Sequence, residues 1–273
     1  MSESDRPVAI VTGASSGIGA ATALEFARKR YAVCLLARRE ERLREVADRC
    51  RNEGAAASVY PCDVTDADAV EQVVRQIVEE YGRVDVLVNN AGMGHHGRVH
   101  EISDEDMNDI LDVNVLGVLH CLRSVAPVMM SRRSGHVFNV SSVIGKRGTP
   151  FNGAYCATKF AVVGLTDSMR VEMMPYKVRV TCVCPGLTDT EFFEKVDGTS
   201  GGVKESSFKT VRTMQSPEVV ARKIVRTVGR NKPELVFTAG GKLLVWLAPR
   251  FPRLVDWMMK KYHDDIVKRE RRD

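Results

Sequence analysis

The chain has 273 residues, of which 44% are hydrophobic and 27% are charged. These fractions are typical of soluble globular domains and exclude disordered, collagen-like and coiled-coil chains. The net charge of +5 is too small for a nucleic-acid-binding protein, so we expect no nucleic acid as a partner.

Predicted strands and helices alternate along nearly the whole chain. Short apolar runs predict strands over 8–12, 31–37, 57–60, 84–88, 136–140, 178–183 and 234–238. Apolar residues at helical spacing predict helices over 18–27, 40–53, 65–81 (with Thr65 as N-cap), 103–130, 154–174 and 217–228. This alternation predicts one α/β unit with a parallel sheet covered on both faces, in which ligands bind at the carboxyl ends of the strands.

The first predicted strand ends in a turn that holds three glycines. Gly13, Gly17 and Gly19 do not have the GxGxxG spacing, but they lie between a strand and a helix. Glycines let the backbone approach a pyrophosphate, and a helix N-terminus presents N–H groups and a positive dipole end. The turn therefore favours dinucleotide binding, and a tight structural turn is the alternative.

Tyr155 and Lys159 lie four residues apart on a predicted helix and share one face. A free phenol has a pKa near 10 and is a poor acid or base at neutral pH. An ammonium at roughly 4 Å, in an effective dielectric of about 20, attracts a phenolate by about 4 kcal/mol, or roughly three pKa units. We therefore expect Lys159 to lower the pKa of Tyr155, and an ordinary solvated pair is the alternative.

Further motifs stand around this pair along the chain. They are Thr12-Gly13-Ala14-Ser15-Ser16-Gly17-Ile18-Gly19, Asp63-Val64, Asn89-Asn90-Ala91-Gly92, Asn114, Ser142, Tyr155-x-x-x-Lys159 and Pro185-Gly186. In this order they strongly resemble the classical short-chain dehydrogenase/reductase family, from residue 8 to about 190, two thirds of the chain. The resemblance implies a single Rossmann-type catalytic domain over 1–273, with about seven strands in a doubly wound parallel sheet and helices on both faces.

The resemblance also implies a catalytic role for four residues. Tyr155 would be the general acid and base, and Lys159 would lower its pKa and hold the nicotinamide ribose. Ser142 would orient the substrate oxygen, and Asn114 would hold a water that links Lys159 to solvent.

A larger set of residues is implied to bind the cofactor. Asp63 and Val64 would contact adenine, and the segment after the sixth strand would flank the nicotinamide. The implied set is Gly13, Ser15, Ser16, Gly17, Ile18, Gly19, Arg38, Arg39, Asp63, Val64, Asn90, Ala91, Gly92, Tyr155, Lys159, Pro185, Gly186, Thr188 and Thr190.

The end of the second strand, Ala37-Arg38-Arg39, bears on the choice of cofactor. In the family that the sequence resembles, NAD-specific members carry an Asp at the Ala37 position, which repels a 2′-phosphate. Ala37 cannot repel it, and the Arg38 guanidinium, assisted by Ser15 and Arg39, matches phosphate geometry. We expect NADP(H) to be preferred over NAD(H), although Ser16 stands where some NADP-using relatives have a basic residue. Solvated charges before a helix are the alternative.

Two segments near the end of the chain extend this description. Residues 191–215 fall where the family carries a substrate lid, and Phe192, Phe193 and Val196 are expected to cover a pocket. The extension 241–273 contains an apolar stripe of Phe251, Leu254, Val255, Met258, Tyr262 and Ile266 in a helix started by Pro252. Three roles stay open for it: packing on its own core or a partner subunit, a wall of the substrate pocket, and peripheral contact with a membrane.

The seven cysteines include no Cys-x-x-Cys pair, so we expect buried free thiols, a reducing cytoplasmic compartment and no metal site. His95 and His96 are expected on a surface loop, with lining of the substrate mouth as the alternative.

The resemblance also implies an oligomeric state. The helices over about 104–130 and 154–174 would pack against the same helices of another copy and form a homodimer or homotetramer.

Together these features predict an NADP(H)-dependent oxidoreductase that interconverts a carbonyl and a secondary alcohol on a small-molecule substrate, a lipophilic ketone, alcohol or acyl substrate. The alternatives are an NAD-dependent hydroxy-lipid or steroid dehydrogenase, and a non-catalytic cofactor-sensing protein on the same fold.

Overall fold

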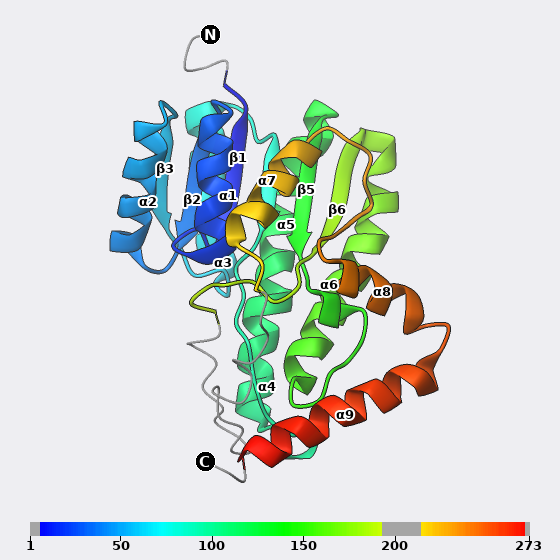
Figure 1. The fold of residues 1–273 in the computed structure, drawn as a ribbon. Coiled ribbons are helices and arrows are strands. Elements are labelled where there is room, and N and C mark those ends of the chain that lie inside the picture. The colour runs from blue at the N-terminus through cyan, green and yellow to red at the C-terminus, as the bar shows by residue number, and fades with distance from the viewer. Residues whose placement is uncertain (1–5, 193–213, 271–273) are drawn as a thin grey trace.

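A seven-stranded parallel sheet forms the centre of the protein (Figure 1). The computed structural model describes residues 6–192 and 214–270. The strands are β1 (Val8–Thr12), β2 (Ala32–Ala37), β3 (Ala57–Pro61), β4 (Val86–Asn89), β5 (Gly135–Val140), β6 (Val178–Cys184) and β7 (Glu234–Val236). Their order across the sheet is β3-β2-β1-β4-β5-β6-β7. The predicted doubly wound parallel sheet is thereby confirmed.

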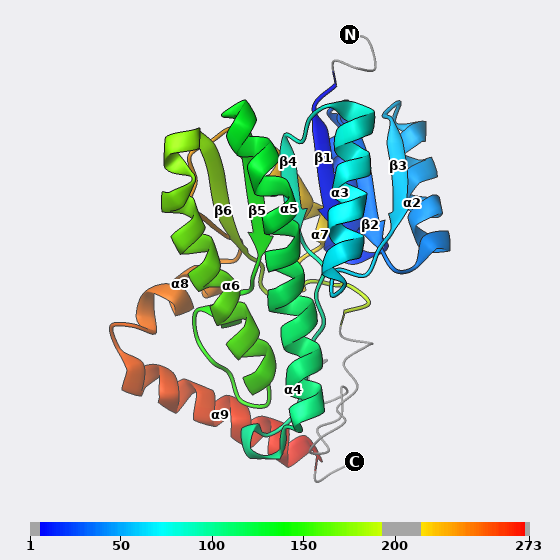
Figure 2. The ribbon, with the colours of Figure 1, turned by 180° about the vertical axis from the view of Figure 1, so that it is seen from behind.

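Helices cover both faces of this sheet (Figures 1 and 2). The helices are α1 (Gly17–Arg28), α2 (Glu40–Asn52), α3 (Ala67–Tyr81), α4 (Asp104–Leu111), α5 (Gly117–Arg132), α6 (Gly153–Glu172), α7 (Pro217–Thr227), α8 (Ala239–Leu247) and α9 (Pro252–Glu270). Helices α1, α2 and α7 lie on the face seen in Figure 1, and α3, α5 and α6 lie on the face seen in Figure 2. Helices α4, α8 and α9 extend past the end of the sheet toward which the β5 arrow points.

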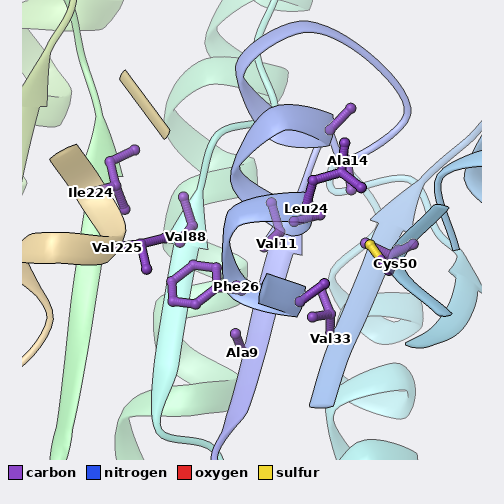
Figure 3. Packing of buried hydrophobic residues seen from close by; sticks show 14 of the residues in the cluster. Ala9, Val11, Ala14, Leu24, Phe26, Val33, Cys50, Val88, Ile224 and Val225 are labelled. Atoms are coloured by element: carbon purple, nitrogen blue, oxygen red, sulfur yellow. The ribbon is translucent and has the colours of Figure 1, made fainter. Parts of the chain in front are cut away.

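Alternate residues of each central strand contribute to two separate hydrophobic cores. In β1, Ala9 and Val11 pack with Phe26 of α1 on one face (Figure 3). Their neighbour Ile10 packs with Ile77 of α3 on the other face. Because side chains alternate across a strand, strands buried on both faces have continuous apolar sequences. This explains why the apolar runs located the central strands correctly.

The order of the strands also fixes where a ligand can bind. The chain runs outward from β1 through β2 to β3 and then returns to form β4 on the other side of β1. Val11 of β1 therefore pairs with Leu35 of β2 on one side and with Val88 of β4 on the other. In open parallel sheets, ligands bind outside the carboxyl ends of the strands at such a switch point. The glycine turn after β1 and the Asn-Asn-Ala-Gly turn after β4 both lie there.

Several predicted element boundaries were wrong for identifiable local reasons. The N-cap of α3 is Asp66, whose carboxylate accepts a hydrogen bond from the Ala69 N–H, whereas the Thr65 hydroxyl donates to Asp63. The last strand ends at Val236 rather than at Thr238, because the Thr238 hydroxyl caps α8, a helix that the sequence analysis did not predict.

The long helix predicted over 103–130 contains a π-helical turn. Helices α4 and α5 form one helical path from Asp104 to Arg132, interrupted by the π-turn Asp112–Leu116. This path is apolar and long enough to span a membrane by composition, but nearly half of its most apolar window is buried inside the protein. It packs against α3 and the sheet, so it is a core helix of the fold.

Candidate active site

Four side chains predicted to be catalytic lie together at the carboxyl edge of the sheet. Ser142 follows β5 and hydrogen-bonds the Tyr155 hydroxyl. The Lys159 Nζ lies 5.5 Å from the centre of the Tyr155 ring. A Cβ placed on Gly92 would lie 3.1 Å from Asn114 Oδ1 and 3.4 Å from Lys159 Nζ, so Asn114 and Lys159 meet at the turn after β4. The structure therefore places all four around one point.

Ser142 is positioned by the short helical turn that follows it. Its hydroxyl accepts a hydrogen bond from the Ile144 N–H at 3.3 Å, and the Val143 N–H donates to the Pro185 carbonyl at 3.0 Å. A Cβ on Gly145 would lie 2.8 Å from the Lys159 carbonyl oxygen, so this turn packs directly on α6. The backbone on both sides of Ser142 is thus fixed to the strand-end loop and to the helix that carries Tyr155.

Lys159 is buried, with only 4% of its surface exposed. Its ammonium donates to the Val140 carbonyl at 3.0 Å. Burial lowers the pKa of Lys159 to about 8, against a smaller opposite effect of the Cys182 and Cys184 thiols nearby. The ammonium is therefore charged at neutral pH and loses its charge in the mildly alkaline range.

The pKa of Tyr155 does not shift in the predicted direction. Burial of its hydroxyl raises the pKa, Cys156 adds to the rise, and the hydrogen bond from Ser142 opposes it in part. The expected lowering assumed an ammonium at roughly 4 Å, whereas the Lys159 Nζ is directed to the Val140 carbonyl. Loss of hydration therefore exceeds the attraction to the lysine, and Tyr155 is a protonated phenol at neutral pH.

Asn114 lies on the π-turn and is fully buried. Its Oδ1 accepts from the Met93 N–H at 2.8 Å, and its Nδ2 donates to the Met93 carbonyl at 2.9 Å and to Thr158 Oγ1 at 3.0 Å. These bonds tie the loop after β4 to α6. π-Turns inside helices occur frequently at functional sites, and here the turn directs the amide into the catalytic cluster.

The glycine turn and the turn after β4 are joined by close contacts. Gly13 has a φ of +62°, and a Cβ there would lie 2.9 Å from both Ala91 Cα and Asn90 Nδ2. The Asn90 amide donates to the Thr12 and Gly13 carbonyls, and the Thr12 hydroxyl accepts from the Asn90 and Ala91 N–H groups at 3.0 Å each. Thr12 is therefore a positioning residue to which the sequence analysis gave no role.

The basic residues after β2 are arranged differently from the prediction. Arg39, rather than Arg38, reaches the glycine turn, where its Nη2 donates to Ser15 Oγ at 3.0 Å and to Ser16 Oγ at 2.9 Å. Its Nη1 pairs with the Glu191 carboxylate at 3.1 Å. Arg38 is 74% exposed and lies 3.6 Å from Asp63. The guanidinium at this edge of the site is therefore that of Arg39.

Asp63 and Val64 take local roles at the end of β3. The Asp63 carboxylate accepts from the N–H and the hydroxyl of Thr65, at 3.0 and 2.9 Å. Partial burial raises the pKa of Asp63, but these hydrogen bonds and Arg38 outweigh it and hold the pKa below its usual value. Val64 is buried against Gly117 at the start of α5, where a Cβ would lie 2.6 Å from Val64 Cγ2.

The segment after β6 first passes the glycine turn and then reaches Tyr155. The Thr188 hydroxyl donates to the Gly186 carbonyl at 3.0 Å, and a Cβ on Gly17 would lie 2.9 Å from Thr190 Cγ2. The Phe192 ring lies 5.5 Å from the Tyr155 ring, so the first residues of the predicted lid contact the site. The other expected lid residues, Phe193 and Val196, lie outside the described residues.

The two histidines after β4 are not on an open surface loop. His95 and His96 are 4% and 5% exposed, and His95 Nε2 lies 3.7 Å from an Asp106 carboxylate oxygen on α4. The expectation of an exposed surface loop is therefore wrong for these two side chains.

The arrangement fits a dinucleotide. Gly13 leaves no room for a side chain between the two turns, and Arg39 and two serine hydroxyls provide groups for a phosphate. Lys159 lies at the turn after β4, with its Nζ 5.5 Å from the centre of the Tyr155 ring. A half-buried phenol beside an ammonium and a serine hydroxyl can exchange a proton with an oxygen atom of a substrate.

Comparisons with known proteins agree with this geometry. The chain is 36% identical over 189 residues to a 3-oxoacyl-(acyl-carrier-protein) reductase of Thermotoga maritima, a match that covers 69% of this chain and 77% of that protein. A short chain dehydrogenase/reductase from Burkholderia phymatum in complex with NAD has a TM-score of 0.85 at 26% identity, covering 93% of this chain and 96% of that one. An alcohol dehydrogenase from the archaeon Thermococcus sibiricus, complexed with 5-hydroxy-NADP, has a TM-score of 0.74 at 30% identity, covering 85% and 96%.

The match to a protein family covers most of the chain. Residues 7–200 match the short chain dehydrogenase family. This range includes the glycine turn, Asn114, Ser142, Tyr155 and Lys159. The fold, the cluster and the relatives lead to one conclusion: this protein belongs to the short chain dehydrogenase family of oxidoreductases that use a nicotinamide cofactor.

Proposed function

We propose that this protein is an NADP(H)-dependent oxidoreductase that interconverts a carbonyl and a secondary alcohol. The observation that carries the proposal is the cluster at the carboxyl edge of the sheet, where Ser142 hydrogen-bonds Tyr155 and the Lys159 ammonium lies 5.5 Å from the phenol ring. Similarity to a ketoacyl reductase and to an alcohol dehydrogenase supports the same reaction class.

In this reaction Tyr155 is the proton donor to the carbonyl oxygen. Burial keeps its phenol protonated at neutral pH, as a general acid requires. The buried Lys159 ammonium stabilises the phenolate that remains after the transfer, because a charge is weakly screened in such an environment. Ser142 orients the substrate oxygen beside Tyr155, and Asn114 holds the loop after β4 against α6. The bound nicotinamide supplies or accepts the hydride.

The preference for NADP(H) rests on Arg39. Its guanidinium lies at the end of β2 and is fixed by the hydroxyls of Ser15 and Ser16, and a guanidinium binds phosphate oxygens through paired hydrogen bonds. Ala37 at the end of the same strand has no charge to oppose a 2′-phosphate. We propose that Arg39 binds the 2′-phosphate, with NAD(H) as the weaker cofactor.

A lipophilic ketone or acyl substrate is supported by the aromatic groups beside the phenol. Phe192 packs at 5.5 Å from Tyr155, and Phe151 lies buried on the segment between Ser142 and Tyr155. Apolar side chains of this size favour an apolar substrate.

We also propose that the protein is a homodimer or homotetramer that assembles through α5 and α6. Phe160 and Val171 on α6 are 46% and 63% exposed, and Leu116 at the start of α5 is 41% exposed. Large apolar side chains on adjacent helices are typical of an interface between copies of a chain.

A substrate panel tests the reaction. The purified protein is incubated with ketones and 3-oxoacyl thioesters in the presence of NADPH or NADH, and oxidation of the cofactor is followed by absorbance. We expect turnover of at least one lipophilic carbonyl with NADPH and its loss in Tyr155→Phe. Equal turnover by the wild type and by Tyr155→Phe on a confirmed substrate would refute the proposed role.

A further inference from the structure

The two C-terminal helices form a corner that projects from the rest of the protein. Helix α8 leaves the sheet, the chain turns at residues 248–251, and α9 runs back past the ends of α6 and α4 (Figures 1 and 2). In both views the corner is the outermost point on its side of the molecule. It lies beyond residue 200, where the family match ends.

Large apolar side chains are exposed along this corner. Six of them, 41–64% exposed, are Leu243, Trp246, Phe251, Leu254, Trp257 and Met258. They include both tryptophans of the chain. The Trp246 and Phe251 rings lie 6.3 Å apart, so the side chains of α8 and of the turn form one surface. An exposed apolar surface of this kind is typical of an interaction site.

The opposite side of α9 is packed on the protein, which holds the apolar side outward. Val255 and Ile266 are buried, and Ile266 contacts Phe151. The His263 and Phe151 rings stack at 5.1 Å, and Asp256 pairs with Arg147. Of the apolar stripe predicted on α9, only Val255 and Ile266 are buried, so this stripe is divided between the core and the surface.

The net charge of the corner distinguishes between two partners that could cover it, a second copy of the chain and a lipid surface. Residues 239–262 carry five basic side chains and one acidic side chain, Asp256, which is paired with Arg147. One of the five, Lys260, is paired with Asp264 at 2.7 Å. A second copy seated on this surface across a two-fold axis would bring two surfaces of net positive charge together, which is unfavourable. An anionic lipid surface attracts the same charges, and tryptophan is enriched where a membrane meets water.

We propose that the α8–α9 corner docks on the surface of an anionic lipid bilayer. Trp246, Phe251, Leu254 and Trp257 enter the boundary between headgroups and acyl chains. The basic side chains Lys242, Arg250, Arg253, Lys260 and Lys261 remain at the phosphate level. This proposal concerns a surface outside the catalytic site and does not depend on the proposed function.

Tryptophan fluorescence reports the docking directly, because both tryptophans of the chain lie on the corner. The full chain is titrated with vesicles of phosphatidylcholine that contain one third phosphatidylserine, and with vesicles of phosphatidylcholine alone. We expect a blue shift of the emission and co-sedimentation with the anionic vesicles, both reduced by salt. The same emission with and without anionic vesicles would overturn the proposal.

Matched variants separate docking from folding and from assembly. Each basic residue near an anionic surface contributes about fivefold to binding, so Arg253→Gln with Lys261→Gln should weaken vesicle binding by about 25-fold. Lys29→Gln with Arg49→Gln removes two exposed charges from the opposite end of the chain and should leave binding unchanged. Equal weakening by both pairs would overturn the proposal, as would a change in oligomeric mass on Trp257→Ser in light scattering without vesicles.

Discussion

Arg39→Ala should weaken NADPH binding far more than NADH binding. Arg39 makes charge-assisted hydrogen bonds at this site, and such a bond contributes about 1.5–3 kcal/mol. In the structure its Nη1 is paired with the partly exposed Glu191 at 3.1 Å, and exposed ion pairs contribute about 0.2–1 kcal/mol. The 2′-phosphate must compete with this carboxylate, so we expect a net loss of about 0.5–2.8 kcal/mol, or about 2- to 110-fold in Kd.

The same competition predicts an opposite effect at Glu191. Glu191→Gln removes the competing charge and should strengthen NADPH binding about 1.5- to 5-fold while leaving NADH unchanged. Arg38→Ala is the matched control, because Arg38 is 74% exposed and pairs with Asp63 at 3.6 Å. We expect it to change either affinity by less than about threefold.

The assay is titration of the purified variants with NADPH and with NADH, followed by nucleotide fluorescence. A loss of NADPH affinity that is larger in Arg38→Ala than in Arg39→Ala would show that the structure assigns the phosphate site to the wrong guanidinium. An equal loss of both cofactors in Arg39→Ala would show that Arg39 only holds the glycine turn in place.

Three further outcomes follow from the site, and one from the helix surfaces. Tyr155→Phe should lower kcat by about 10²- to 10⁴-fold with NADPH binding retained, as measured by steady-state kinetics and titration. Burial lowers the pKa of Lys159 to about 8, so its positive charge is present below that pH and lost above it. We therefore expect kcat/KM for carbonyl reduction to fall about tenfold per pH unit above about pH 8. A pH profile that stays flat to pH 10 would contradict this. Gly13→Ala should lower the free energy of unfolding, measured in urea. A left-handed backbone conformation costs a residue with a Cβ about 1–2 kcal/mol, and the loss should exceed this because the new Cβ would lie 2.9 Å from Ala91 Cα. Light scattering should give at least twice the chain mass of 30.3 kDa, and a monomer at micromolar concentration would exclude the α5–α6 interface.

The parts of the protein that the sequence predicted well depend on local patterns. Central strands buried on both faces appear as apolar runs, and parallel strands place their carboxyl ends at one edge. Ser142 after β5 and Tyr155 and Lys159 on one helix face could therefore be placed together from the sequence.

The features that the sequence did not predict depend on tertiary contacts that no local pattern contains. Arg38 and Arg39 are adjacent, and what distinguishes them is Glu191, which lies 152 residues from Arg39 along the chain. The direction of the Tyr155 pKa shift depends on burial of its hydroxyl and on the Val140 carbonyl that receives the Lys159 ammonium. Helix spacing gave the face shared by the pair but neither of these contacts.

The contact between α9 and the segment before Tyr155 has a consequence for protein engineering. Phe151 has a φ of +63°, unfavourable for a bulky residue, and His263 and Ile266 of α9 hold it in place. Helix α9 thus stabilises the segment that leads into Tyr155, whereas the contacts at the glycine turn come from residues 12–91 together with 190 and 191. A chimera that exchanges the C-terminal helices between relatives must therefore keep the contacts of His263 and Ile266 with Phe151, whereas the glycine turn is untouched by the exchange.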